Sequence, residues 1–470
     1  MLAGDFFCPD VPGVGGMFMD DKRPGVNAGF VTGPIALPLL RFALPLMLSL
    51  LLQALYGGVD LAVVGRFAQT ESVSAVATGS QVMQAITVLI TGLTMGVTVL
   101  IGKFMGAGDA RAAGDVVSAQ VKLFAGVAVV LTAIMVALAP QAARLMNVPE
   151  AAVAQTVSYV RVCSGGIVFI TAYNAISGIF RGLGNSRSPF LFVAIACVAN
   201  IVLDLLCVGG LGMAATGAAL ATVLAQALSV AFSLGYMRRH PLPFEVSLRA
   251  GSARSAAGIL KIGSPIALQD FLNTVSFLII TSIVNSLGLI ASAGIGISEK
   301  QFVFLSIVPM SFMSALSAFV AQNMGAHRPG RARLALRSAL MIALALGVPV
   351  FAATHFAGGT LAALFSSDAD VVAATAEYLR GSSFEYLMIP VTFCLLGYFN
   401  GREHTAFTMI QGLLASFLVR IPLSYLLSRV PGTSMWLISL AVPASSMANM
   451  ALCVAYYVLL RRRERVRGEE

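Results

Sequence analysis

The chain has 470 residues, of which 58% are hydrophobic and only 11% carry a charged side chain. A soluble globular protein carries roughly 25% charged residues, so this composition, with a mean hydropathy of +0.87, excludes an ordinary soluble protein. The net charge of +9 does not indicate a nucleic-acid partner, because the basic residues fall mainly in loops on one side of the predicted topology.

Uncharged apolar runs follow one another along the chain, and each is long enough to cross a hydrocarbon core of ~30 Å, which takes about 20 residues. Strands of a β-barrel would alternate polar and apolar residues over about ten positions, and these runs do not. We therefore expect an all-α integral membrane protein. Dividing the runs at charges, Pro and Gly gives twelve spans, at 36–60, 76–101, 117–139, 155–180, 188–208, 213–236, 262–286, 294–320, 338–362, 375–399, 406–428 and 435–459.

Residues 1–35, ahead of the first span, are expected to form a cytoplasmic amino-terminal tail. Pro and Gly follow Phe6 and Phe7, and the segment has no apolar core of the length that a signal peptide needs. Because Met17 and Met19 lie downstream, two interpretations stay open: a native tail, or an artefact of an early start codon.

The distribution of basic residues predicts the orientation in the membrane. Most of the 30 Lys and Arg residues lie in the amino-terminal segment, the even-numbered loops and the tail, whereas only Arg66, Arg144 and Arg429 lie in the opposite loops. The positive-inside rule then places both termini in the cytoplasm of a multi-pass protein of the bacterial inner membrane. Residues 461–470 are expected to be a basic tail that contacts the anionic leaflet.

The sequence carries no recognisable enzyme or metal motif. The six Cys are scattered without a CxxC pair and the four His are isolated, so both are interpreted as packing or polar residues. No HExxH, nucleophile elbow or P-loop is present, and we expect neither catalysis nor a cofactor.

The chain aligns with itself at an offset of 219–220 residues. Pro45 falls on Pro265, the Met-Gly-Ala run 105–107 falls on 324–326, and Gly182 falls on Gly401. Each repeat holds six spans, an even number, so the repeats are parallel, with a cavity expected between them. We expect an amino-terminal lobe at 36–236, a cytoplasmic linker at 237–261 and a carboxy-terminal lobe at 262–460.

Two acids, Asp60 and Asp204, lie inside long apolar runs of the first repeat, and the second repeat has Ile280 and Leu423 in their places. An acid at the centre of a membrane helix costs about 2.5–3.5 kcal/mol on insertion scales. Asn200 precedes Asp204 by four residues and therefore shares its helix face. Carboxylate and amide oxygens suit a hard cation or a proton, although a local cap or hydrogen bond remains the alternative for each acid.

Further polar side chains could line the cavity, although an interhelical hydrogen bond is the more ordinary role for any one of them. We expect Glu299 to pair locally with Lys300, and we leave the role of Glu385 open. The candidate cavity residues are Gln53, Gln81, Asn174, Asp270 and Asn273.

Several short motifs, in order and at consistent spacing, carry a resemblance to a known family. They are Pro45 with Val59-Asp60 and Gly65, Gly102 to Gly108, Phe180 to Ser186, Asn200 with Asp204, Gly212 with Gly217 to Thr222, Gly263-Ser264-Pro265, and Ala321 to Ala326. Over residues 36–460 the chain resembles the multidrug and toxic compound extrusion (MATE) family, on its DinF-like side.

The resemblance implies two six-helix lobes in a V and a secondary antiporter that expels organic cations and related amphipathic drugs in exchange for Na⁺ or H⁺. It implies an ion site at Asp60, Asn200, Asp204 and Thr222, with Pro45 as the bending point of the first helix. No stable oligomer is required, so we expect a monomer in contact with membrane lipid.

The resemblance leaves two points open. Asp270 is near the first position of a carboxy-lobe ion site found in another branch of the family, and Glu385 is about one turn from the second. The alternative function is a lipid-linked oligosaccharide flippase of the same superfamily. Its cavity should be basic to hold pyrophosphate, whereas the midplane charges predicted here are mainly acidic.

Overall fold

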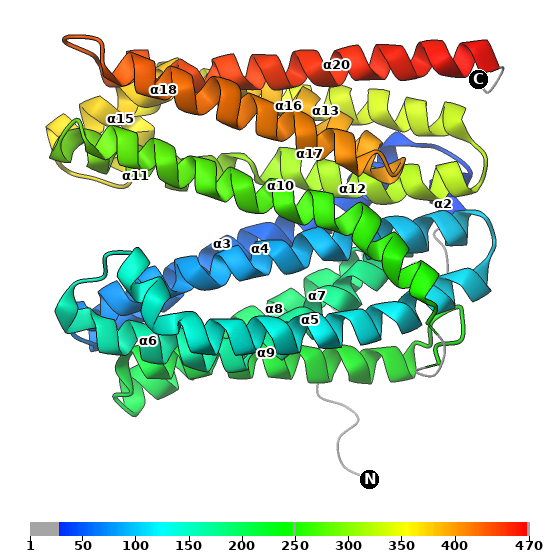
Figure 1. The fold of residues 1–470 in the computed structure, drawn as a ribbon, viewed down its shortest axis with the longest axis horizontal. Coiled ribbons are helices and arrows are strands. Elements are labelled where there is room, and N and C mark those ends of the chain that lie inside the picture. Colours follow the sequence, from blue (N-terminus) through cyan, green and yellow to red (C-terminus); the bar gives the residue numbers. More distant parts are fainter. Residues whose placement is uncertain (1–27, 248–250, 468–470) are drawn as a thin grey trace, which may run out of the picture.

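The computed structural model describes residues 28–247 and 251–467, and within these ranges every regular element is a helix. The long helices run alongside one another and form two lobes, which are the lower and upper halves of Figure 1. This arrangement confirms the all-helical, two-lobe architecture that the sequence predicts.

The lower lobe contains the helices of the first repeat. A short helix, α2, precedes them and lies against the other lobe. The elements are α2 (Ala28–Val31), α3 (Ala36–Phe67), α4 (Thr70–Gly106), α5 (Ala110–Leu145), α6 (Glu150–Gly165), α7 (Ile167–Gly182), α8 (Arg187–Asp204), the π-helix η1 (Leu205–Gly210) and α9 (Ala214–Arg239).

The upper lobe contains the second repeat, which begins after the linker. Its elements are α10 (Ala253–Asn285), α11 (Leu289–Leu305), α12 (Ile307–Gly325), α13 (Pro329–Phe356), α14 (Gly358–Ala363), α15 (Ala369–Ser382), α16 (Glu385–Gly401), α17 (Thr405–Leu413), the π-helix η2 (Leu414–Arg420), α18 (Ile421–Ser428), α19 (Met435–Ser439) and α20 (Ala441–Arg467).

Ten continuous helical stretches of the described chain are long and apolar enough to cross a membrane. Two further spans are broken: α6 and α7 meet at 46°, and α15 and α16 meet at 51°. Counting each bent pair as one span gives the twelve that the sequence predicts. The breaks fall in matched spans, the fourth of each repeat, so the two repeats share this bend.

The two ends of the bundle differ in charge, and we name them accordingly. The basic end, on the right in Figure 1, holds the turns that follow α4, α12 and α16, together with Lys103, Arg328 and Arg402. The far end is the opposite one, where α3 ends and α4 begins.

The matched Met-Gly-Ala runs lie where the two lobes meet at the basic end. A Cβ atom on Gly106 would overlap the backbone carbonyl of Gln322, and one on Gly325 would overlap that of Lys103. The contact is therefore reciprocal, and a side chain at either position would force the backbones apart. This close approach gives the physical reason for the glycine at both repeat positions.

Two polar side chains extend the same reciprocity. Lys103 of α4 reaches Glu403, in the turn after α16, with Nζ 2.5 Å from Oε1. Gln322 of α12 donates from Nε2 to the backbone carbonyl of Gly182, at the end of α7, at 2.8 Å. Each lobe thus contacts the equivalent turn of the other, and these contacts hold the lobes together at the basic end.

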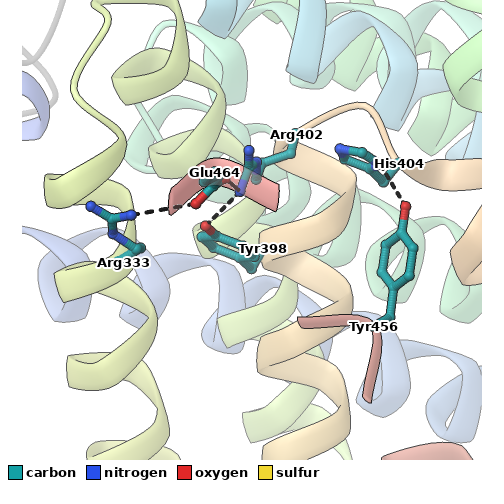
Figure 2. Close-up of polar contacts among 6 residues, drawn as sticks. All are labelled: Arg333, Tyr398, Arg402, His404, Tyr456 and Glu464. Atoms are coloured by element: carbon teal, nitrogen blue, oxygen red, sulfur yellow. Dashed lines mark hydrogen bonds and ion pairs between the residues drawn. The ribbon is translucent and has the colours of Figure 1, made fainter. Parts of the chain in front are cut away.

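The carboxy-terminal segment differs from the expectation of a tail that begins at residue 461, because α20 continues to Arg467. Glu464 is buried and its two carboxylate oxygens contact Arg402, at 2.5 Å, and Arg333, at 3.3 Å (Figure 2). Arg402 also donates to the Tyr398 hydroxyl at 2.9 Å. The acid in this basic run therefore fixes the helix end to the upper lobe.

His404 lies beside this network and shares a hydrogen bond of 2.9 Å with the Tyr456 hydroxyl (Figure 2). Burial, and next the positive charge of Arg402, lower the pKa of His404. The neutral ring is consequently the form that suits this packing, and it ties the turn before α17 to α20.

The glycine contact between the lobes predicts a position-specific cost. Gly325→Ala should destabilise the folded protein by about 1–3 kcal/mol, the usual range for overpacking a tight contact. Thermal unfolding of the purified protein in detergent measures the effect. Gly126→Ala is the matched control, because no atom lies within 4 Å of a Cβ built on this glycine of α5. Equal midpoints for the two variants would contradict the contact.

Candidate functional site

Four of the predicted site residues come together in the lower lobe, although they lie on three helices. Asp60 belongs to α3, Asn200 and Asp204 to α8, and Thr222 to α9. The Asp60 carboxylate lies close to the side chains of the other three. Asp60 is 6% exposed, Asn200 2% and Asp204 0%, so the cluster is shielded from solvent and lipid.

Several buried polar atoms of this cluster lack hydrogen-bond partners among the described residues. These atoms include Oδ1 of Asp60, both amide atoms of Asn200 and both carboxylate oxygens of Asp204. The Thr222 hydroxyl donates to the carbonyl of Ala218 at 3.0 Å, which leaves its oxygen as an acceptor for a cation. Because an unpaired buried charge is costly, two adjacent carboxylates in this state call for a proton or a cation.

A change of helix type follows Asp204 directly. Helix α8 ends at Asp204, and the π-helix η1 takes over at Leu205. Such single-turn π-segments interrupt the regular hydrogen-bond ladder and are frequent at functional sites. The α-helix resumes with α9 at Ala214, after a turn in which Gly212 and Ala214 adopt φ values of +65° and +50°. The local fold therefore sets Asp204 at the junction of two helical registers.

Pro45 lies inside α3, between the basic end and Asp60. A proline within a helix removes one backbone hydrogen bond and permits a bend. The hydroxyl of Ser49 donates to the Pro45 carbonyl at 2.8 Å, one turn further along. Asp60 is fifteen residues beyond Pro45, or about 22 Å along a helix that rises ~1.5 Å per residue.

The predicted cavity residues separate into two groups. Asn174 and Asn273 make interhelical hydrogen bonds, the first with Thr91 at 3.3 Å and the second with Ser416 at 3.1 Å. Both contacts match the alternative given in the sequence analysis, in which such a side chain makes an interhelical hydrogen bond and does not line a cavity. Gln53 and Gln81 are instead exposed, and Asp270 is half-buried on α10.

A charged pair in the upper lobe went unrecognised at the sequence level. Glu385 of α16 is buried and contacts Arg420, with Nη2 2.9 Å from Oε1. Ser446 of α20 donates to the same oxygen at 3.0 Å, and the guanidinium lies 5.0 Å from the centre of the Phe277 ring. The sequence signal that could have revealed this pair was one acid and one base, each inside an otherwise uncharged span of the same repeat.

This pair changes the interpretation of the upper lobe. Because Glu385 already has a cationic partner, it differs from Asp60 and Asp204, which form no ion pair with any described residue. Arg420 also adds a buried positive charge to a region that the sequence suggested was mainly acidic. The expected pair of Glu299 with Lys300 is wrong for the described structure, where Glu299 accepts a hydrogen bond from Thr281 of α10.

Within the described ranges, no three His, Cys, Asp or Glu side chains gather into a metal site. A sodium ion at the cluster would therefore depend on the two carboxylates and on the neutral oxygens of Asn200 and Thr222. This mixed oxygen set is the kind that hard cations accept.

The two parallel lobes, the twelve spans and the buried acids define a polytopic membrane transporter rather than an enzyme. The family model described as MatE matches residues 45–206 and again 265–426, so the chain belongs to the MatE family. The two matched segments begin at the matched prolines, Pro45 and Pro265.

Relatives across bacteria share most of the chain. A probable multidrug resistance protein, YpnP, from Bacillus subtilis is 28% identical over 85% of this chain and 90% of its own length. A FAD transporter from Shewanella oneidensis is 25% identical over 92% of this chain and 96% of its own. A structure of a multidrug resistance MATE family transporter in an outward-facing conformation superposes with a TM-score of 0.87 at 21% identity, covering 96% of this chain and all of that one.

The Glu385–Arg420 pair makes a stability prediction. Arg420→Ala should destabilise the protein by about 3–5 kcal/mol, because the change leaves the Glu385 charge buried without its partner. The double variant Arg420→Leu with Glu385→Gln should recover part of that loss. Thermal unfolding in detergent measures both. Arg380→Ala, which removes an exposed charge on α15, serves as the control and should change little.

Proposed function

We propose that the chain is a secondary active multidrug exporter, which antiports organic cations and related amphipathic drugs against H⁺ or Na⁺ by alternating access. It works in the bacterial inner membrane with both termini in the cytoplasm and needs no cofactor. Membership of the MatE family and the description of YpnP as a probable multidrug resistance protein support the substrate class. The coupling rests on the buried carboxylates of Asp60 and Asp204, in which one oxygen of Asp60 and both oxygens of Asp204 have no hydrogen-bond partner among the described residues.

In this proposal the coupling ion neutralises the cluster. The ion enters from outside and binds between Asp60 and Asp204, with Asn200 and Thr222 supplying neutral oxygens. Its charge removes the repulsion between the two carboxylates, and α3 responds by bending at Pro45, which releases the drug. One inward charge supplies about 2.3 kcal/mol per 100 mV, or roughly a 50-fold drug gradient for a one-for-one exchange.

The acidic cluster argues against the flippase alternative. A site for pyrophosphate needs cationic side chains, and an anionic headgroup would be repelled by Asp60 and Asp204. The buried Arg420 does not supply such a site, because Glu385 already compensates its charge. A cationic substrate fits the same acids, and its competition with the coupling ion would give exchange.

The test is transport by Asp60→Asn and Asp204→Asn variants in proteoliposomes with pH and Na⁺ gradients imposed separately. Each variant should lose gradient-driven movement of a cation such as tetraphenylphosphonium. An amide carries no negative charge, so it cannot hold the coupling ion or take up a proton as a carboxylate does. The gradient that drives the unmodified protein identifies the ion. Asp109→Asn is the control, since that exposed acid caps α5 and lies outside the cluster. Undiminished, equally ion-dependent transport by both site variants would refute the assignment.

A second arm of the same assay checks the substrate class. FAD, the substrate in the description of the Shewanella oneidensis relative, is anionic and should not be carried if the acidic cluster selects cations. Gradient-driven FAD movement without movement of any organic cation would contradict the proposal that the substrates are organic cations.

A further inference from the structure

The first helix of the lower lobe divides its buried residues between the two lobes. Near the basic end, Leu39, Phe42 and Leu46 of α3 belong to one core cluster with Leu316 and Phe319 of α12. This cluster otherwise consists mostly of upper-lobe residues. The start of α3 therefore packs as part of the upper lobe, although it precedes the lower lobe in sequence.

The remainder of α3 packs with its own lobe. Val63 and Val64 join a cluster with Val76 of α4 and Tyr159 of α6. This is also the half that carries Asp60. Pro45 lies at the inner end of the half that packs on the upper lobe, next to Leu46, and the passage to the lower-lobe neighbours falls between Leu46 and Val63.

Helix α10, the first helix of the upper lobe, shows the reverse arrangement, because its basic-end half packs on the lower lobe. Its first half places Ile259, Ile262 and Ile266 in a cluster with Ile101 of α4 and Val116 of α5. Figure 1 shows α10 crossing from the upper lobe towards the lower one at the basic end.

The second half of α10 returns to the upper lobe. Ile280 and Val284 pack with Tyr378 of α15 and Ile438 of α19. The crossover falls between Ile266 and Ile280, just beyond Pro265, which is the repeat partner of the proline in α3. The two lobes have thus exchanged the basic-end halves of their first helices.

Arginine side chains of α13 and its cap hold the segment just before α3 on the upper lobe. Arg331 donates to the backbone carbonyls of Phe30, Thr32 and Gly33, at 2.9, 2.8 and 2.7 Å. Arg328 adds a further bond, to the carbonyl of Val31 at 2.7 Å.

An amide and an aromatic contact complete this attachment. The fully buried Asn323 donates to the carbonyl of Phe30 at 3.0 Å. The Phe30 ring is itself fully buried and lies 4.8 Å from that of Phe319. The segment before α3 is therefore attached to the upper lobe through both its backbone and its side chain.

Asp115 of α5 holds the start of α10 in the corresponding way. Its Oδ1 accepts from the backbone amides of Gly251 and Ser252, at 3.1 and 3.0 Å. Its Oδ2 accepts from the hydroxyls of Ser252 and Ser255, both at 2.6 Å. One carboxylate of the lower lobe thus holds the first turn of the upper lobe's first helix.

We propose that Arg331 and Asp115 are positioning residues for alternating access: each fastens the basic-end half of a first helix to the opposite lobe. Both lie in the first turns of the third helix of a repeat, so each repeat contributes one such contact. With these halves fixed, relative movement of the lobes is taken up at Pro45 and Pro265. The proposal rests on the proposed function only in assuming that the lobes move during transport.

Distances between spin labels across the basic end test the proposal without any substrate. The labels are placed at Arg111→Cys of α5 and Arg462→Cys of α20, both exposed, in a chain whose six native Cys are replaced. Loss of several charge-assisted hydrogen bonds should raise the ratio of separated to closed basic ends about tenfold or more in Arg331→Ala and in Asp115→Ala. Arg331→Lys, which keeps the charge and some of the donors, should lie between Arg331→Ala and the parent.

Matched controls remove the same charges from the same helices. Arg337→Ala and Asp109→Ala should keep the parent distance distribution, because Arg337 is an exposed residue of α13 and Asp109 caps α5 itself. Thermal unfolding is followed in parallel. Lower stability of the anchor variants with an unchanged distance ratio would overturn the proposal, since the contacts would then only stabilise the fold. Transport loss in the Asp60 and Asp204 variants is measured separately, so the two proposals can fail independently.

Discussion

Two carboxylates are buried side by side in the lower lobe with no cationic side chain paired to them among the described residues, and the organisation of the site depends on this constraint. Asp60 and Asp204 approach from different helices, and no described donor satisfies their free oxygens. In the upper lobe the buried Glu385 has Arg420 instead. The scaffold is repeated, but the ion pair of the upper lobe has no counterpart at the lower-lobe cluster among the described residues. A pocket of this kind changes its net charge when an ion binds, and the proposed coupling rests on that change.

The repeat also explains how the two lobes contact each other. At the basic end the lobes meet through glycines at matched positions, Gly106 and Gly325, where a side chain would separate the backbones. The first helices extend this relation, because each packs one half on its own lobe and the other half on its neighbour. The far half of α3 carries Asp60, and Arg331 holds the segment just before its basic-end half. One continuous helix therefore joins the Asp60 cluster to the contact between the lobes.

Much of the architecture was predictable from the sequence, for reasons that residues near the site illustrate. The apolar runs predicted twelve spans because a helix must satisfy its backbone internally to cross lipid. The spacing of Asn200 and Asp204 placed them on one helix face. The sequence could not predict that Glu464 would hold the end of α20, or that Arg420 would meet Glu385. Each of these contacts joins residues that are distant in the chain, and nothing local in the sequence encodes the distance between them.

The sequence by itself determined the membrane class, the twofold repeat and the identity of the acids kept in apolar helices. These properties are written in composition, periodicity and residue type, which act over a few helical turns. The tertiary structure alone decided that Asp60 and Asp204 share one buried cluster while Glu385 is paired, and that the halves of α3 and α10 belong to different lobes. Packing between helices sets those relations, because the burial and the charge partners of a side chain depend on neighbours from remote parts of the chain.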